Sequence, residues 1–138
     1  MKRSPGLLAA AAAAVLGLAW LPRASAEPPP AAALWNADRS AAAASMPAAT
    51  GAGLFVFLRQ DDGSFRSIDA SRVEDANLGK LGRARSEFER IETRPVRWLP
   101  RSGGLFRITV QTRAWRQGRR ETAEELLVLR PDGTVLWR

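Results

Sequence analysis

Apolar and polar side chains alternate along one long segment between Leu105 and Trp115. Successive side chains of a β-strand point to opposite faces, so the alternation predicts a strand with one buried face. The buried face carries Phe106, Ile108, Val110, Thr112 and Ala114. The opposite face carries Arg107, Thr109, Gln111 and Arg113.

Two further patterns predict hairpins on either side of this strand. The apolar run 54–58 is typical of a central strand, and Asp61-Asp62-Gly63 supplies a turn back into the strand 64–68. After the long strand, Gln117-Gly118 turns the chain into a partner strand over 124–130. Pro131-Asp132-Gly133 then predicts another turn, followed by a last strand over 134–138.

The region between the hairpins predicts helix followed by a short strand. Ser71 and Glu74 have the spacing of a capping box, so a helix is expected to begin near Ser71. Gly79 and Gly82 interrupt it, and a second helical stretch is indicated by Leu81, Ala84, Phe88 and Ile91 on one helical face. An extended segment over 87–93 is the alternative. Pro95 favours extended backbone, and 96–99 is expected to be a short edge strand.

These elements predict an α+β fold, a small antiparallel sheet of five or six strands built from a hairpin, a helical excursion and a C-terminal meander. One domain is expected over 54–138. The expected core residues are Phe55, Phe57, Phe88, Phe106, Ile108, Val110, Leu127 and Leu129.

The first part of the chain predicts export. Lys2 and Arg3 precede an apolar run, and Ala24-Ser25-Ala26 is typical of a cleavage site, so 1–26 is expected to be a signal peptide removed after Ala26. A periplasmic or secreted protein without a membrane span is expected after cleavage. Residues 27–53, rich in proline and alanine, indicate a linker that is disordered or marginally helical. Leu34 and Trp35 are the candidate anchor for a partner in that linker.

The composition limits the chemistry available to the protein. Histidine, cysteine and tyrosine are absent, which excludes Ser-His and Cys-His nucleophile pairs and zinc sites built on His or Cys. We therefore expect no catalytic residues, metal or cofactor. A small hydrolase using paired carboxylates is the one enzymatic alternative, and no motif in the sequence supports it.

Charge is concentrated in the middle of the chain. Residues 80–120 carry twelve basic and three acidic side chains in a protein of net charge +7. The candidate basic patch consists of Arg107, Arg113, Arg116, Arg119 and Arg120. Such a patch favours anionic envelope partners, lipopolysaccharide or phospholipid headgroups, because export separates the chain from nucleic acid. The competing interpretations are pairing with Glu121, Glu124 and Glu125 across the hairpin, and the arginine bias of a GC-rich genome.

The segment from Phe106 to Arg138, with Leu127-Val-Leu-Arg-Pro-Asp-Gly-Thr-Val-Leu-Trp-Arg138 at its end, resembles the C-terminal hairpin of minor pseudopilins of bacterial type II secretion. The resemblance implies an assembly component. Together, these patterns predict a non-enzymatic interaction or assembly module of the bacterial cell envelope. Its partner is expected to be an envelope protein or an anionic envelope component, and a homo-oligomer is compatible with the pattern.

Overall fold

A computed structural model describes residues 23–25, 28–48 and 51–136. These residues form one sheet of nine strands with a single α-helix, α2 (Arg72–Leu81). The fold is therefore mostly sheet, and the expected α+β fold with five or six strands is wrong. The additional strands come from the alanine-rich segment and from residues that the pattern assigned to a helix.

The first half of the sheet is built around β4 (Gly51–Arg59). β4 pairs in antiparallel fashion with β3 (Ala41–Ala48) and with β5 (Phe65–Asp69). β2 (Leu34–Trp35) pairs with β3, and β1 (Arg23–Ser25) pairs with β5. The predicted hairpin around Gly63 is confirmed, with that glycine at a φ of 88°.

The alanine-rich segment is a buried strand, which corrects the expected linker over 27–53. Ala41, Ala42, Ala43 and Ala44 are buried, with both faces of β3 covered. Alanine has low strand propensity, but it fits where larger side chains from both sides of a sheet leave little room. Packing against β4 outweighs the low strand propensity of alanine, so residues 34–35 and 41–48 form strands and not a helix or a linker.

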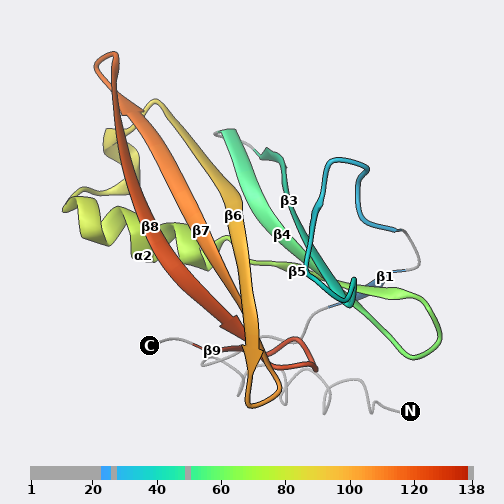
Figure 1. Ribbon diagram of the computed structural model, residues 1–138. Helices are drawn as coiled ribbons and strands as arrows, with labels where there is room; N and C mark the ends of the chain where they lie inside the picture. The colour runs from blue at the N-terminus through green and yellow to red at the C-terminus, as the bar shows by residue number, and fades with distance from the viewer. Residues whose placement is uncertain (1–22, 26–27, 49–50, 137–138) are drawn as a thin grey trace, which may run out of the picture.

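The second half of the sheet contains the longest strands. β6 (Arg90–Ser102), β7 (Leu105–Arg116) and β8 (Arg119–Leu129) form an antiparallel meander, and β9 (Val135–Leu136) pairs with β8. β6 joins the first half through two parallel partners on β4. Figure 1 shows β6, β7 and β8 side by side, with α2 passing behind β7 and β8. The predicted alternation along β7 and the turn at Gln117-Gly118 are confirmed.

The helix α2 begins where the sequence predicted but does not use the predicted capping box. The Ser71 hydroxyl donates to Asp69 instead, and no side-chain hydrogen bond caps the helix. The second helical stretch is wrong, because Gly82 takes a left-handed φ of 69° and ends α2. After a short 3-10 turn at Arg85–Glu87 the chain enters β6, so the extended alternative is correct from Arg90 onward.

The main core lies between the two halves of the sheet. It joins residues of β3, β4 and β5 to the inner faces of β7 and β8, and Val73 of α2 packs into it. Of the expected core residues, Phe55 and Phe88 are only half-buried, and the other six are buried. A second cluster covers the far side of β3 and β4, where Phe57 and Phe65 pack with Trp35.

The expected signal peptide falls largely outside the described residues. Only Arg23–Ser25 belong to the described part, as β1. The division into signal peptide and mature domain stays a prediction. Within the described part of the chain, no helix is long and apolar enough to cross a membrane.

Candidate interaction site

β6 has an edge without a strand neighbour over most of its length. Its pairing with β4 consists of Gly51 with Ile91 and Ala52 with Glu92. From Thr93 onward, β6 pairs only with β7 on its other side, among the residues that the structure describes. An unpaired strand edge exposes backbone N–H and C=O groups that another chain can bind.

An apolar groove of about 390 Å³ runs along this edge. We call it the β6 groove, and its lining residues are Pro30, Ala32, Leu34, Ala44, Ser45, Pro95 and Val96. Its volume lies within the range of roughly 300–1,000 Å³ typical of ligand pockets. Leu34 is 36% exposed and Val96 is 41% exposed, and these are the large hydrophobic residues exposed in the described part of the chain. Because Leu34 and Val96 both line the β6 groove, the two exposed hydrophobic side chains share one site.

Two hydrogen bonds hold the walls of the groove in place. The Ser45 hydroxyl donates to the carbonyl of Thr93 at 2.5 Å, which ties β3 to β6. The indole N–H of Trp98 donates to the carbonyl of Leu34 at 2.8 Å, which ties β2 to β6. The register with β7 shifts between Pro95 and Arg97, leaving Val96 as an extra residue of a β-bulge. The bulge places Val96 in the groove wall.

A smaller hollow of about 250 Å³ lies farther along the same edge. It is lined by Asn36, Ala37, Asp38, Leu99, Pro100 and Arg101. Hydrogen bonds from Ser40 and the positive charge of Arg101 lower the pKa of the exposed Asp38 carboxyl. The Trp98 to Leu34 hydrogen bond stands between this hollow and the β6 groove. The two hollows lie one after the other between residues 30–38 and β6, and we call them together the track.

The structure separates the two residues of the predicted anchor. Leu34 lines the β6 groove, as a partner contact requires. Trp35 points to the other side of β2, where its ring meets Phe65 edge-on at a centroid distance of 5.9 Å. The guanidinium of Arg39 covers the Trp35 ring at 4.3 Å. Trp35 thus holds the N-terminal segment on the sheet, and only Leu34 is placed to contact a ligand.

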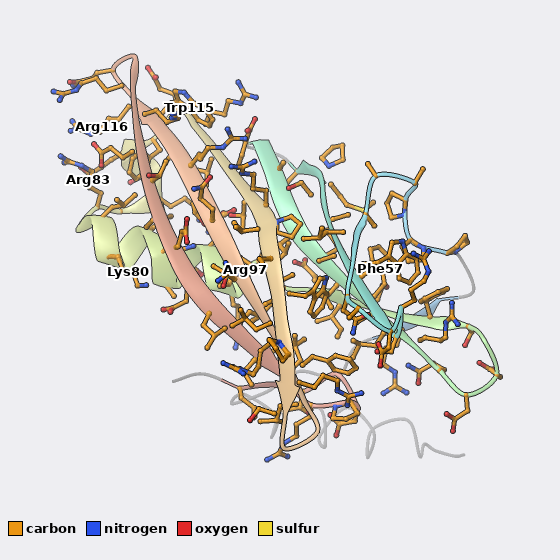
Figure 2. The ribbon with its side chains drawn as sticks, in the orientation of Figure 1. Phe57, Lys80, Arg83, Arg97, Trp115 and Arg116 are labelled. Carbon is orange, nitrogen blue, oxygen red and sulfur yellow. The ribbon has the colours of Figure 1, made fainter. Side chains whose placement is uncertain are left out.

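The face of β6, β7 and β8 that is turned away from α2 is rich in arginine. Cross-strand pairing places six arginines and two glutamates on this outer face: Arg90, Arg94, Arg97, Arg107, Arg113, Arg120, Glu92 and Glu124. In Figure 2, Arg97 lies over the middle of these strands, whereas Lys80 and Arg83 lie beside α2. No interaction partner of Arg97 or Arg120 is found among the described residues. Arg90 stacks on the Trp115 ring at 4.9 Å.

The predicted basic patch is divided between the two faces of the sheet. Arg107 donates to the carbonyl of Pro100 at 3.2 Å, and Arg113 contacts Glu92 at 3.5 Å on the outer face. Arg116 lies on the side of α2 and pairs with Glu121 at 3.5 Å, opposite Arg119 in the register. Pairing across the hairpin thus exists for Arg116. Arg107, Arg113 and Arg120 share the outer face, and Arg116 and Arg119 do not.

Sequence reasoning missed the contributions of β6. Arg90, Arg94 and Arg97 complete the outer face, and Val96 completes the groove. Arg90 lies in the segment 87–93, for which the sequence allowed either helix or extended structure, so its cross-strand neighbours were not predictable. Pro95 was a usable signal, because proline within a strand marks an edge or a bulge.

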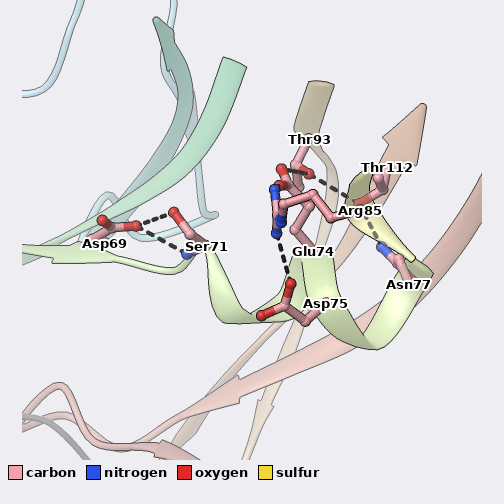
Figure 3. A network of polar contacts seen from close by, with 8 residues as sticks. All are labelled: Asp69, Ser71, Glu74, Asp75, Asn77, Arg85, Thr93 and Thr112. Atoms are coloured by element: carbon pink, nitrogen blue, oxygen red, sulfur yellow. Dashed lines mark hydrogen bonds and ion pairs between the residues drawn. The ribbon is translucent and has the colours of Figure 1, made fainter. Parts of the chain in front are cut away.

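A buried polar network fastens α2 to the sheet (Figure 3). Thr93 donates to Glu74 at 2.7 Å, so the hydroxyl contact of 2.9 Å between Thr112 and Thr93 must be donated by Thr112. Asn77 donates to Thr112 at 2.9 Å. The hydrogen bonds therefore run in one direction, from Asn77 through the two threonines to the Glu74 carboxylate.

Arg85 closes this network from the surface. Its guanidinium pairs with Glu74 and, at 2.6 Å, with Asp75. Burial lowers the pKa of Arg85, but the hydrogen bonds that its guanidinium donates to Asp75 and Glu74 outweigh burial and raise that pKa. The hydrogen bonds of this network hold α2 on the sheet, although the buried Oδ1 of Asn77 has no partner among the described residues. None of the network residues lines a hollow of the track. Among the described residues, no group of three acidic side chains is close enough to bind a metal ion.

Comparison with known proteins gives no relative. No family model, curated protein or solved structure matches the chain.

Proposed function

We propose that this protein is an exported, non-enzymatic interaction module of the bacterial cell envelope, which binds a protein partner along the open edge of β6. One observation carries the proposal. Leu34 and Val96, the large hydrophobic residues exposed in the described part of the chain, line the same groove beside an unpaired strand edge. Single exposed hydrophobic residues are normal on a surface, but their convergence in one groove is typical of an interaction site.

The form of the site favours a polypeptide ligand. An extended segment that pairs with a sheet edge gains affinity from backbone hydrogen bonds and specificity from pockets for alternate side chains. The β6 edge supplies backbone groups that pair with no other strand, apart from the Thr93 carbonyl, which accepts from Ser45. The two hollows of about 390 Å³ and 250 Å³ lie along this edge as pockets. The hydrogen bonds of Ser45 and Trp98 fix both walls before binding, so little ordering is required of this chain.

The cellular setting of the proposal rests on the sequence. Lys2, Arg3 and the cleavage site at 24–26 support export and processing after Ala26. A periplasmic or secreted location follows from that processing. A pseudopilin-like secretion component, which the resemblance of 106–138 implies, is an alternative to this proposal.

The outer arginine face favours a second candidate function, binding to an anionic envelope surface. Six arginines and only two glutamates share that face, and Arg97 and Arg120 have no partner among the described residues. Guanidinium groups bind phosphate and carboxylate through paired hydrogen bonds. Lipopolysaccharide and phospholipid headgroups carry such groups. This candidate uses the sheet face, whereas the first uses the sheet edge, so single substitutions separate them.

Affinity capture with matched variants tests the proposed function. The tagged full chain and its Val96→Asp and Thr122→Asp variants are expressed in the native host and captured from the envelope fraction, with and without a high-salt wash. Both substitutions add one carboxylate at an exposed position, but only Val96 lines the groove. We expect a discrete protein that survives the wash and is lost only with Val96→Asp. Equal capture by both variants contradicts binding in the groove, and release of lipid or glycan by salt favours the arginine face.

A further inference from the structure

We infer that the ligand of the β6 groove is an extended acidic segment of polypeptide, with an aliphatic side chain between Leu34 and Val96 and carboxylates beside Arg94 and Arg97. This inference rests on the proposed function and specifies the chemistry of the partner. Two observations carry the inference: the lining of the groove is apolar, and the residues beside it, Arg94 and Arg97, are cationic.

The groove itself carries no charge. Its lining consists of two prolines, two alanines, Leu34, Val96 and one serine. Such a lining matches an aliphatic side chain of moderate size, because burying apolar surface is favourable and no charged group there needs a partner. The Ser45 hydroxyl is already engaged with the carbonyl of Thr93.

The rim beside the groove is cationic. Arg94 and Arg97 flank the Pro95-Val96 pair in the chain, and both are exposed. Arg94 uses its Nε to donate to Gln111 at 3.1 Å, and no described residue contacts its terminal nitrogens. Arg97 makes no contact with a polar group of the described residues. Two guanidinium groups are therefore presented with donors available for an incoming carboxylate.

The register of β6 places the apolar groove and the two arginines where one extended ligand can contact both. Arg94 pairs with Gln111 and Arg97 with Thr109, so both arginines stand on the outer face. Val96, the extra residue of the bulge, lines the groove between them. Side chains of an added strand point alternately to its two faces. A strand beside β6 would therefore alternate aliphatic residues toward the groove with acidic residues toward the arginines.

Peptide binding measured by fluorescence anisotropy tests this pattern. The protein is the exported chain as it is purified from its native host. The first probe is a short fluorescein-labelled peptide in which valine alternates with glutamate. The second replaces each glutamate by glutamine, and the third replaces each valine by serine. The protein variants are Arg97→Gln and Val96→Ser. Arg119→Gln is the matched control, because Arg119 is exposed at the start of β8 and does not line the groove.

We expect the valine-glutamate probe to bind most tightly. Arg97→Gln is expected to weaken it by about two- to fivefold, the range of an exposed charge pair, and to reduce its salt dependence. Val96→Ser is expected to weaken it by about fivefold or more through lost apolar contact. Arg119→Gln is expected to bind as the unchanged protein does. Because Val96 and Arg97 are exposed, unfolding midpoints in urea should stay unchanged in these variants.

Different failures separate this inference from the function on which it rests. If the glutamine probe binds as tightly as the glutamate probe and Val96→Ser weakens both, the acidic preference is wrong and the groove function stands. If Val96→Ser has no effect while Arg97→Gln does, binding is to the arginine face and both proposals fall. If no probe binds and phosphatidylglycerol vesicles bind instead, the polypeptide ligand is overturned in favour of a lipid surface.

Discussion

The indole N–H of Trp98 donates a 2.8 Å hydrogen bond to the backbone carbonyl of Leu34 across 64 positions of sequence. This contact joins residues 30–38 to β6 and separates the two hollows of the track. The Trp98 ring also packs edge-on against Phe106 at a centroid distance of 6.3 Å. One side chain thus links the core, the groove wall and the position of Leu34.

Replacing Trp98 with phenylalanine should keep the ring in the core and remove the hydrogen bond. We expect a loss of about 1 kcal/mol in the free energy of unfolding, measured in urea, because an intramolecular hydrogen bond is lost. Partner capture should fall more than stability alone explains, since Leu34 loses its tie to β6. Trp115→Phe is the control, because the described residues hold no hydrogen bond of the Trp115 indole. Equal effects of the two substitutions would show that the indole contact does not position the groove.

The polar network under α2 predicts a difference between two threonines of β7. Thr112→Val removes an acceptor of Asn77 and the donor to Thr93, and all three side chains are buried. We expect a cost of about 1–3 kcal/mol in unfolding free energy, because buried polar groups lose their partners. Thr109→Val on the outer face makes the same chemical change where no side-chain hydrogen bond is lost. It should change stability by less than about 0.5 kcal/mol.

The alanine strand predicts that size is restricted in the middle of β3. Ala43 is fully buried in the main core, so Ala43→Leu should destabilise the protein by about 1–3 kcal/mol through overpacking. Ala48→Leu, at the exposed end of the same strand, should be tolerated. Thermal unfolding of the two variants compares them directly. A linker over 27–53 would instead make both substitutions neutral.

Two glycines predict opposite effects of the same substitution. Gly51 has a φ of 150°, and a Cβ there would lie 2.0 Å from the carbonyl oxygen of Ile91. Gly51→Ala should therefore break the junction of β4 with β6, at about 3 kcal/mol or more of unfolding free energy. Gly79 is inside α2 with nothing within 4 Å of its Cβ position, so Gly79→Ala should stabilise by about 0.5–1 kcal/mol. If Gly51→Ala raised the unfolding free energy as Gly79→Ala is expected to do, the β4–β6 pairing would be contradicted.

The sequence predicted those elements whose local pattern agrees with their environment. β7 alternates because one face is buried, and Gly63, Gly118 and Gly133 mark turns because all three take positive φ. β3 was not predictable in this way, since its alanines are buried by residues of β4 and by Trp35. The spacing of Leu81, Ala84, Phe88 and Ile91 resembled a helix, yet Gly82 ended α2 and Ile91 packs from a strand. Tertiary packing overrode local preference in both segments.

The candidate site was predictable only in part for the same reason. Leu34 stood out as a large apolar residue in a segment rich in proline and alanine, and it lines the groove. Its groove partner Val96 depends on a β-bulge, and Arg94 and Arg97 depend on cross-strand register. Neither feature has a local signature beyond Pro95. The sequence therefore indicated an arginine-rich region, and the register decides which arginines share a face.

Site-specific photo-crosslinking in the native host tests the central claim most directly. A photoreactive phenylalanine analogue is placed at Val96 in the β6 groove and, as the control, at Thr122, which is exposed on the outer face of β8. We predict one discrete protein adduct from position 96, diminished in the Arg97→Gln background and absent from position 122. The same adducts from both positions, or none from position 96 while the protein remains folded, would contradict an interaction site on the open edge of β6.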